Sequence, residues 1–276
     1  MWSRLATDGV KYAAAFFGAM AVTLLLTPLL RETARKIGMV DQPNARRINK
    51  TPIPRGGGVS IFVAFHLVLG VLVLAMGGPI SRSVSFFWQG RFLLASGLLV
   101  VIGLVDDQRG MKPVMKLSGQ IAVALILYFS GVRVGGILVA FPPWLDCLVT
   151  VFWIVGAVNA FNLIDGLDGL AAGLALIAAA GMAGALLFTG RSADTLPYLV
   201  LAGACLGFLR YNFHPASVFL GDSGSMFLGL CIAVLPLITG SRKELVASLG
   251  MPLLAMGIPI FDTLLAIWRR SIRALL

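Results

Sequence analysis

The sequence predicts an all-α protein, a polytopic bundle of membrane-spanning helices. Hydrophobic residues make up 58% of the 276 residues and charged residues only 12%, whereas roughly a quarter of the residues of a soluble domain are charged. A helix needs about 20 residues to cross the hydrocarbon core, and apolar stretches close to this length recur along the chain. No linker or soluble insertion separates them. We therefore expect a single integral membrane domain over residues 1–276.

Each apolar window is bounded by charged, Gly or Pro residues and is predicted to form one helix. The first window lacks a small-residue cleavage site and is followed by further windows, so we expect a retained helix instead of a signal peptide. Several windows are short, which leaves open one re-entrant pair. The spans, about nine in number, are predicted at residues 10–30, 58–76, 92–105, 114–129, 145–160, 170–188, 196–209, 225–239 and 245–267.

Basic residues set the expected orientation, because Lys and Arg are retained on the cytoplasmic side. Alternate loops, beginning after the first span, hold fourteen of them, and the opposite loops with the N-terminal tail hold eight. The N-terminus is therefore predicted outside. Acidic residues contribute little to topology yet show the same bias, which indicates a shared site at the inner span ends. Those on the inner side are Glu32, Asp41, Asp106, Asp107, Asp165, Asp168, Asp222 and Asp262.

The net charge of +10 does not predict nucleic-acid binding, because the basic residues are dispersed among apolar spans and form no single solvated face. Anionic membrane lipids and phosphorylated ligands are the expected counterparts. The three cysteines, Cys147, Cys205 and Cys231, are widely spaced without a CxxC pair. We expect them to be core thiols.

The third span ends in GLVDD, with Asp106 and Asp107 side by side. Two adjacent carboxylates near the headgroup level are costly unless a cation or a hydrogen-bond donor compensates them. This arrangement suits a Mg²⁺ site or a basic residue paired with a metal. A polar stop at the end of a span is the alternative.

The segment NAFNLIDGLDGLAAG, residues 159–173, places an acceptor-rich side chain at every third position. Helical spacing would align these side chains on one face, and the intervening glycines allow close backbone approach or a break in the helix. A binding site explains the pattern better than ordinary loop polarity does. The four side chains are Asn159, Asn162, Asp165 and Asp168.

The segment FLGDSGS, residues 219–225, puts Asp222 between glycines just before a span. Ser223 and Ser225 are candidate caps for that helix. Its N-terminal N–H groups could hold a phosphate while Asp222 holds a metal. A simple helix N-cap is the alternative.

The longest inner loop contains DQPNARRINKTPIPRGGG, residues 41–58. Its basic side chains offer charge-assisted hydrogen bonds to phosphate, and the glycines at 56–58 would let the backbone approach a ligand. A positive-inside anchor is the alternative. The basic residues are Arg46, Arg47, Lys50 and Arg55.

Three further polar residues carry a weaker functional signal. His66 lies inside an apolar span and is expected to make a helix-to-helix hydrogen bond. His214, beside Pro215, is either structural or a ligand contact. Asp262 is expected to pair with Arg269 or Arg270.

Six motifs at the inner loops resemble, in their order, those of the polyprenyl-phosphate N-acetylhexosamine-1-phosphate transferases. They extend over about residues 31–270 and are PNxRR, PIPRGGG, VDD, NAFNLIDGLDGLAAG, FLGDSGS and PxxD. The likeness is to the undecaprenyl-phosphate N-acetylglucosamine-1-phosphate transferase type, which is related to phospho-N-acetylmuramoyl-pentapeptide transferase. It implies transfer of a sugar 1-phosphate from a UDP-N-acetylhexosamine to undecaprenyl phosphate, with release of UMP. The implied setting is the cytoplasmic face of the bacterial inner membrane, at the first membrane step of a cell-envelope glycan such as lipopolysaccharide. Mg²⁺ is the implied cofactor, with Mn²⁺ as an alternative, and a homodimer is left open.

The resemblance also implies roles for individual residues. Asp106 and Asp107 serve the lipid phosphate, and Asp106 is the better candidate for deprotonating it. Asn162 and Asp222 form the metal site. The nucleotide-sugar residues are Asn159, Asp165, Asp168 and Phe219, with Phe219 placed to stack on uracil. The phosphate-binding residues are Arg46, Arg47, Arg55 and Lys116.

The sequence departs from the family pattern at two places. Asn49 stands where members commonly have His, and the chain stops at Leu276, before the family's His-rich loop and a further span. A degenerate homologue that binds polyprenyl phosphate without catalysis is therefore the alternative to an enzyme. A secondary transporter is a third hypothesis, although it would place its charged residues near mid-membrane.

Overall fold

The computed structural model describes residues 2–42, 51–76, 85–135 and 141–240, together with four single residues between 257 and 269. Within these ranges the chain forms eight α-helices and one pair of very short strands. Arg46, Arg47, Asn49 and Asp262 lie outside the described residues, as does nearly all of the predicted span at 245–267.

The helices follow the apolar windows closely, since each of the eight overlaps one of the first eight predicted spans. A two-stranded antiparallel pair and a short 3₁₀ helix complete the described structure. In chain order the elements are α1 (Trp2–Lys36), β1 (Val40–Asp41), β2 (Ile53–Pro54), α2 (Val59–Ala75), α3 (Phe86–Arg109), α4 (Pro113–Phe129), α5 (Pro143–Ile164), α6 (Leu170–Phe188), η1 (Ser192–Thr195), α7 (Leu196–Asn212) and α8 (Gly221–Thr239).

Six of the described helices are long and apolar enough to cross a membrane, and these are α1, α3, α5, α6, α7 with η1, and α8. The other two, α2 and α4, have 17 residues each and are shorter apolar helices. The all-α, multi-pass membrane architecture is therefore confirmed. The number of about nine spans and the single domain over 1–276 stay predictions.

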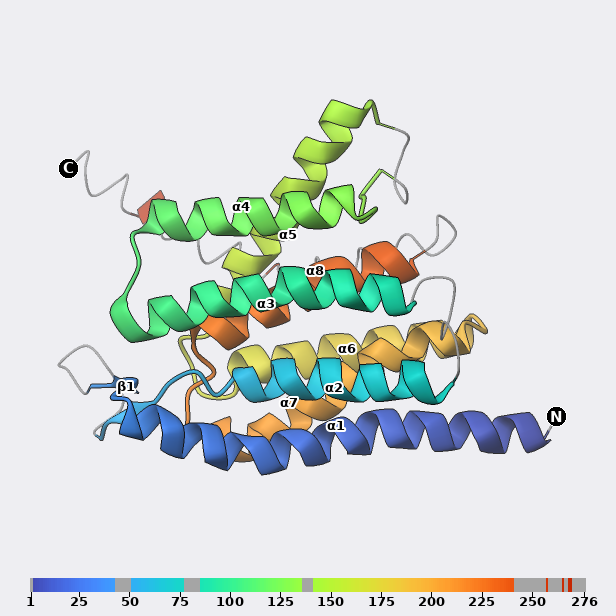
Figure 1. Cartoon of the computed structure of the whole chain (residues 1–276), viewed down its shortest axis with the longest axis horizontal. Helices are drawn as coiled ribbons and strands as arrows, with labels where there is room; N and C mark the ends of the chain where they lie inside the picture. The colour runs from blue at the N-terminus through green and yellow to red at the C-terminus, as the bar shows by residue number, and fades with distance from the viewer. Residues whose placement is uncertain are drawn as a thin grey trace.

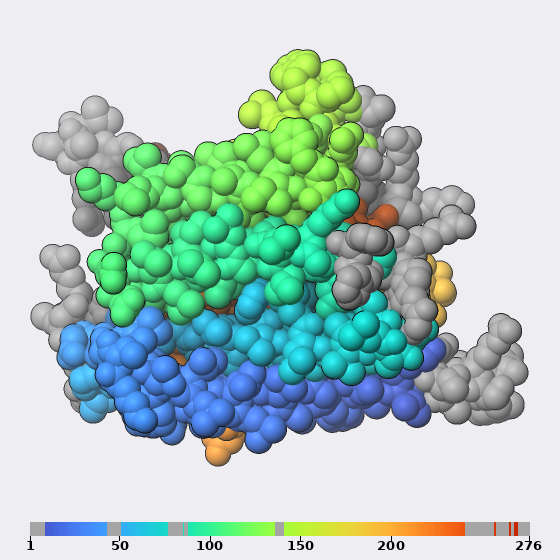
Figure 2. Space-filling model, in the orientation of Figure 1, coloured from blue at the N-terminus to red at the C-terminus, as the bar shows by residue number. Residues whose placement is uncertain are grey.

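The most buried of the candidate spans, α8, packs against α2, α3, α5 and α6. In Figure 1, α1, α2, α3 and α4 run roughly side by side, whereas α5 is steeply inclined to them. Figure 2 shows α1 to α4 as contiguous rows on one face of the molecule. Almost every residue of α8 is buried, and its main partners are α5 and α3. It forms one part of the core, and α7, which packs on α1, α2 and α6, forms another.

Large apolar side chains point outward on the peripheral helices, as expected for contact with lipid. Leu25 of α1, Leu94 of α3 and Phe152 of α5 are 72%, 74% and 79% exposed. A soluble protein rarely exposes so many large apolar residues together. The outward faces therefore agree with the membrane setting that the composition predicts.

Between helices, small residues and polar contacts hold the packing, as is common in membranes. A Cβ atom added to Gly203 of α7 would lie 2.0 Å from the carbonyl oxygen of Phe16 in α1, and one added to Gly207 would lie 2.6 Å from that of Met20. The two helices can therefore approach only because α7 has glycine there. The expected helix-to-helix bond of His66 is also confirmed, because its Nε2 lies 2.9 Å from the Ser96 hydroxyl of α3.

Candidate active site

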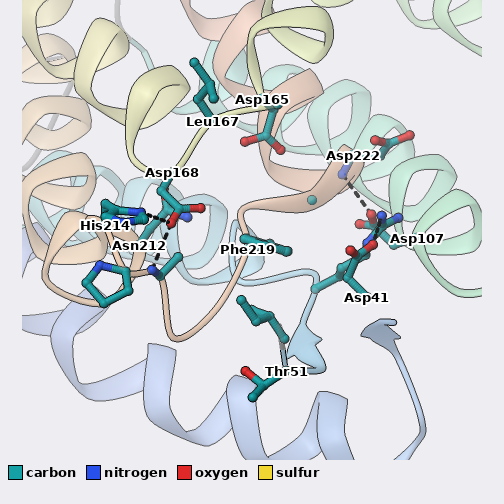
Figure 3. Close-up of a pocket in the computed structure, with 16 residues that line it drawn as sticks. Asp41, Thr51, Asp107, Asp165, Leu167, Asp168, Asn212, His214, Phe219 and Asp222 are labelled. Atoms are coloured by element: carbon teal, nitrogen blue, oxygen red, sulfur yellow. Dashed lines mark hydrogen bonds and ion pairs between the residues drawn. The ribbon is translucent and has the colours of Figure 1, made fainter. Parts of the chain in front are cut away.

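The described parts of four predicted inner loops converge at one end of the bundle and share the lining of a cavity of about 540 Å³ (Figure 3). Four separate connections contribute to its wall. The α1–α2 connection gives Thr51, Ile53 and Arg55, and the end of α3 gives Asp107. The α5–α6 turn gives Asp165, Leu167 and Asp168, and the α7–α8 connection gives Asn212, His214 and Phe219.

Phe219 is held at this cavity by backbone pairing with the segment before α2. The Phe219 N–H donates to the Pro54 carbonyl at 2.8 Å, and the Gly57 and Gly58 N–H groups donate to the carbonyls of Phe219 and Leu220, both at 3.0 Å. The glycine run was expected to let the backbone approach a ligand. In the structure it lets the backbone approach the α7–α8 connection, which fixes Phe219 between the Asp168 side and the Asp107 side of the cavity (Figure 3). The approach to a ligand stays a prediction.

The first turn of α8 is capped by a residue from α3. Asp107 Oδ1 accepts from the Asp222 N–H at 2.9 Å, and Asp107 Oδ2 accepts from the Ser223 N–H at 3.2 Å and the Ser223 hydroxyl at 3.1 Å. The expected local caps do not form, because Ser223 donates to Asp107 and the Ser225 hydroxyl contacts Asn162 Nδ2 at 2.9 Å.

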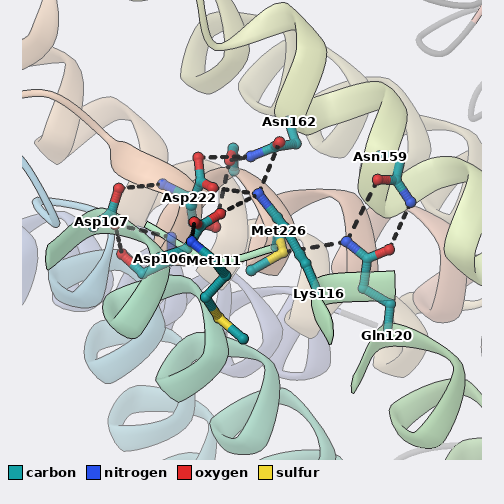
Figure 4. A network of polar contacts seen from close by, with 11 residues as sticks. Asp106, Asp107, Met111, Lys116, Gln120, Asn159, Asn162, Asp222 and Met226 are labelled. Atoms are coloured by element: carbon teal, nitrogen blue, oxygen red, sulfur yellow. Dashed lines mark hydrogen bonds and ion pairs between the residues drawn. The ribbon is translucent and has the colours of Figure 1, made fainter. Parts of the chain in front are cut away.

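Beside this cap, four helices bring polar side chains together around the Lys116 ammonium (Figure 4). Lys116 Nζ lies 2.8 Å from Asp106 Oδ2 and 3.2 Å from Asn162 Oδ1, and it forms an ion pair with Asp222. Asn162 Nδ2 donates to Asp222 Oδ1 at 3.0 Å. The Met111 N–H donates to Asp106 Oδ1 at 2.6 Å. Lys116 was expected to bind phosphate, and in the structure it joins the carboxylates.

The same cluster has donors that suit a hard cation. Within the described ranges no three His, Cys, Asp or Glu side chains converge as a ready metal site. Two carboxylates and one amide oxygen, from Asp106, Asp222 and Asn162, already surround the Lys116 ammonium. Mg²⁺ is commonly held by one or two carboxylates together with substrate phosphates. The donor set therefore fits Mg²⁺.

On the other side of the cavity, Asp168 joins the α5–α6 turn to the α7–α8 connection. Its Oδ2 accepts from His214 Nδ1 at 2.9 Å and from the Ala216 N–H at 3.0 Å. Asn212 reinforces the junction, because its Oδ1 accepts from the Gly169 N–H at 3.1 Å. The turn itself requires glycine, since Gly169 has φ +72°.

Asp165 faces the acidic side of the cavity. Desolvation raises the pKa of its carboxyl group well above the usual value, and the nearby carboxylates of Asp107 and Asp222 raise it further. The Gly221 N–H and the Arg55 charge oppose the shift. Several acidic groups thus share one region, which is the environment that an added cation would stabilise.

The motif order and the clustering of these acidic residues are accompanied by a direct family match. Residues 90–240 match the model of glycosyl transferase family 4. This chain belongs to glycosyl transferase family 4. The family 4 match covers most of α3 and all of α4 to α8, the helices that supply the Lys116 cluster and most of the cavity.

Relatives of this family 4 chain cover most of its length. It is 38% identical to a probable undecaprenyl-phosphate N-acetylglucosaminyl 1-phosphate transferase of Bacillus subtilis, over 95% of this chain and 72% of the relative. It is 36% identical to a decaprenyl-phosphate N-acetylglucosaminephosphotransferase of Mycobacterium tuberculosis, over 92% and 69%. It is 35% identical to a phospho-N-acetylmuramoyl-pentapeptide-transferase of Moorella thermoacetica, over 89% and 79%.

Four described site predictions for the family 4 chain do not line the cavity, namely Asp106, Lys116, Asn159 and Asn162. Three of them form the adjacent Lys116 cluster, whereas Asn159 makes other contacts. Asn159 lies one helical turn away from Asn162, where its Nδ2 donates to Gln120 Oε1 at 2.6 Å and to the Val155 carbonyl at 2.8 Å. Gln120 of α4 also contacts the Met226 sulfur at 3.4 Å. Asn159 thus joins α5 to α4, and the cavity wall does not include it. Its nucleotide-sugar role stays a prediction, beside the interhelical role that these hydrogen bonds indicate.

Arg55 lines the cavity but is already paired. Its guanidinium forms an ion pair with Asp41, whose side chain is only 4% exposed. The pair closes the base of the long inner loop, where Asp41 of β1 lies opposite Ile53 of β2. Any phosphate contact by Arg55 would therefore use its remaining N–H groups. The phosphate roles expected for Arg46 and Arg47 fall outside the described residues.

Sequence reasoning missed three residues that shape this site. Asp41, Gln120 and Asn212 each hold a neighbouring segment in place. Asp41 was counted among the inner acidic residues, which was a usable signal. The sequence carries no comparable signal for Gln120 or Asn212, because each acts only on a segment that folding brings near.

Proposed function

We propose that the protein transfers N-acetylglucosamine 1-phosphate from UDP-N-acetylglucosamine to undecaprenyl phosphate, releasing UMP. The observation that carries this proposal is the cluster of Asp106, Lys116, Asn162 and Asp222 beside the cavity. Membership of family 4 and the printed functions of the Bacillus and Mycobacterium relatives support it. The donor sugar, the length of the polyprenol and the release of UMP are parts of the proposal.

The reaction brings two anions together, so charge repulsion is its first barrier. An oxygen of undecaprenyl phosphate forms a bond to the phosphorus of the sugar phosphate, and the bond from that phosphorus to UMP breaks. Lys116 and Arg55 supply positive charge near the cavity. Preorganised positive groups of this kind stabilise the charge that develops on transferring phosphoryl oxygens.

Asp106 is the proposed acceptor of the proton on the lipid phosphate. Its Oδ2 pairs with Lys116 and its Oδ1 accepts from the Met111 N–H, so the carboxylate is oriented at the end of α3. Asp222 and Asn162 are the residues that would hold Mg²⁺, or Mn²⁺ in its place. When bound there, the cation supplies neutralisation of the phosphate oxygens.

The cavity is the proposed nucleotide side of the site. Phe219 offers an aromatic face for uracil, and Asp168 and Asp165 offer acceptor oxygens for the nucleotide N–H and hydroxyl groups. The aromatic ring and Asp168 lie on neighbouring walls of one cavity (Figure 3). A phosphate at the edge next to Asp222 would lie close to the Lys116 cluster.

We place the site at the cytoplasmic face of the bacterial inner membrane. The basic residues favour this orientation, because the loops predicted to be on the inner side hold fourteen Lys and Arg residues against eight in the opposite loops and tail. UDP-sugars are made in the cytoplasm, so the orientation also gives the donor access. Labelling introduced cysteines from either side of sealed vesicles tests the sidedness.

The test of the activity uses the full chain in detergent or membranes, with radiolabelled UDP-N-acetylglucosamine and undecaprenyl phosphate. The wild type should form labelled lipid and an equal amount of UMP, and EDTA should stop both. Asp222→Ala and Asp106→Asn should abolish the products, whereas Asp146→Asn, at the far end of α5, should keep them. If the wild type binds undecaprenyl phosphate but yields no UMP, the protein is the non-catalytic homologue instead.

A further inference from the structure

The two adjacent carboxylates of the VDD motif have different surroundings. Asp106 is directed toward Lys116, with 2.8 Å between Asp106 Oδ2 and Lys116 Nζ. Asp107 is directed into the first turn of α8, where both of its oxygens accept hydrogen bonds (Figure 4). The two sequence neighbours thus have different partners: Asp106 pairs with the Lys116 ammonium, and Asp107 accepts from the N-terminus of α8.

The three hydrogen bonds of Asp107 match the pattern of a helix N-cap. The first N–H groups of a helix lack partners inside it and need an acceptor, and a capping side chain serves the second and third of them. In α8 these are the N–H groups of Asp222 and Ser223. No cap comes from the residue that precedes the helix, so α3 supplies the acceptor.

Tight packing fixes this arrangement. A Cβ atom added to Gly103, one turn before Asp107 on α3, would lie 2.4 Å from the Ser223 Cα. One added to Gly221 would lie 2.6 Å from Asp107 Oδ2. Close helix contact on one side and a glycine on the other therefore leave the Asp107 carboxylate little freedom to leave the α8 terminus.

We propose that Asp107 is a positioning residue: it caps α8 and thereby holds Asp222 toward Lys116 and Asn162, and it takes no part in proton transfer. The donor of the shortest Asp107 bond is the backbone N–H of Asp222 itself, at 2.9 Å. A change at Asp107 therefore moves the residue that would hold the metal. The metal-binding role of Asp222 rests on the proposed function, whereas the capping of α8 by Asp107 is independent of it.

The test is a graded series of purified full-length variants. Ser223→Ala removes one of the three bonds, Asp107→Asn keeps an acceptor oxygen and the side-chain shape, and Asp107→Ala removes the cap. The readouts are the dissociation constant of Mn²⁺ alone by electron paramagnetic resonance, the unfolding temperature, and kcat as a function of Mg²⁺ concentration. Asp146→Ala is the matched control, because Asp146 also holds a backbone N–H, that of Gly135, but at the far end of α5.

If Asp107 positions Asp222, the Mn²⁺ dissociation constant should rise in the order Ser223→Ala, Asp107→Asn, Asp107→Ala, by about 10-fold to 100-fold for the last, as is typical when a residue supporting a metal ligand is lost. Raising the Mg²⁺ concentration should restore the kcat of Asp107→Asn to within about tenfold of the wild-type value. Loss of a catalytic base would reduce kcat much further. Asp146→Ala should change the unfolding temperature without changing Mn²⁺ binding.

Two outcomes overturn the proposal. One is loss of about 10³-fold or more in kcat for Asp107→Asn at every Mg²⁺ concentration with unchanged Mn²⁺ affinity, as expected for a catalytic base. The other is a lower unfolding temperature with unchanged Mn²⁺ affinity throughout the series, which marks a purely structural cap. If the wild type has no transferase activity but the Mn²⁺ order holds, the proposed function fails and the positioning role stands.

Discussion

The ammonium nitrogen of Lys116 lies 2.8 Å from a carboxylate oxygen of Asp106, and the same ammonium pairs with Asp222. α4 thus supplies the positive charge that lets α3 and α8 bring two carboxylates together. Lys116 is only 14% exposed and Asp106 only 15%. Both groups are therefore largely removed from water. Loss of one partner in such a setting leaves the charges of the others uncompensated.

The first prediction concerns this compensation. Lys116→Met should destabilise the metal-free protein by about 3–5 kcal/mol, the usual cost of breaking a buried ion pair. Because a divalent cation can replace the lost charge, added Mg²⁺ should raise the unfolding temperature of the variant more than that of the wild type. Thermal unfolding in detergent, with EDTA or MgCl₂, measures both effects.

The control for Lys116→Met is Arg191→Met, which breaks the ion pair with Asp194 that precedes α7. Its loss of stability should be insensitive to Mg²⁺. Equal responses of the two variants to Mg²⁺ would mean that the Lys116 carboxylates do not form a cation site.

The second prediction follows from Asp165, whose pKa is raised by desolvation and by the carboxylates of Asp107 and Asp222. A carboxyl group with a raised folded-state pKa favours folding while it is protonated, and this contribution is lost as pH rises through the raised pKa. Asn mimics the protonated form. The unfolding temperature of Asp165→Asn should therefore exceed that of the wild type near neutral pH, and the gap should close toward about pH 4.

Thermal unfolding across this pH range, without divalent cations, measures the gap. Glu32→Gln is the control, because its side chain is 52% exposed and pairs with Arg35 on the surface of α1. A gap for Asp165→Asn that is constant with pH would contradict the expected titration.

The third prediction separates two roles for Asn159. If it joins α5 to Gln120 of α4, replacing either residue with Leu removes the hydrogen bond between them, and the double variant should lose less stability than the two single variants together. The coupling energy should be about 0.6 kcal/mol or more, as for hydrogen bonds between membrane helices. A double-mutant cycle of unfolding free energies measures it.

The rival role, a contact with the nucleotide sugar, gives a different signature. Asn159→Leu would then raise KM for UDP-N-acetylglucosamine specifically, and the coupling with Gln120→Leu would be absent. That pair of results would support the role that the family resemblance suggested.

The fourth prediction tests the contact of α7 with α1. Gly203→Ala should cost about 1–3 kcal/mol, the usual range for overpacking, because the added Cβ would meet the Phe16 carbonyl at 2.0 Å. Gly184→Ala is the matched change, since a Cβ there has open space and the residue lies within α6. It should be neutral or stabilising by up to about 1 kcal/mol, as measured by unfolding in the same detergent.

Much of this fold could be predicted, because apolar windows are a direct consequence of the thickness of a membrane. Alternation of loops then places residues from distant segments at one end, which is why Asp106, Asn162 and Asp222 were expected together. Helix ends were less predictable, because several helices continue beyond their apolar windows. The spans predicted at 92–105 and 225–239 correspond to α3 (Phe86–Arg109) and α8 (Gly221–Thr239), both of which extend into polar residues of the site.

The details that were missed all depend on which helices are neighbours. Local pattern indicated Ser223 as a cap for α8, yet Asp107 of α3 provides it. Helical spacing put Asn159 on the same helix face as Asn162, but it could not show that Asn159 would form a hydrogen bond with Gln120 of α4. Tertiary contacts decide such choices, and one sequence contains no record of them.

The contact between Gly58 and Gly224 limits what other sequences can occupy these positions. A Cβ atom on Gly58 would lie 2.1 Å from the Gly224 Cα, and one on Gly224 would lie 2.6 Å from the Gly58 Cα. Since both residues are already the smallest possible, neither can shrink to accommodate a larger partner. Second-site suppressors of a substitution at either glycine are thus expected at other positions, where a change lets α2 and α8 move apart. Two distant parts of the sequence therefore share one mutational constraint.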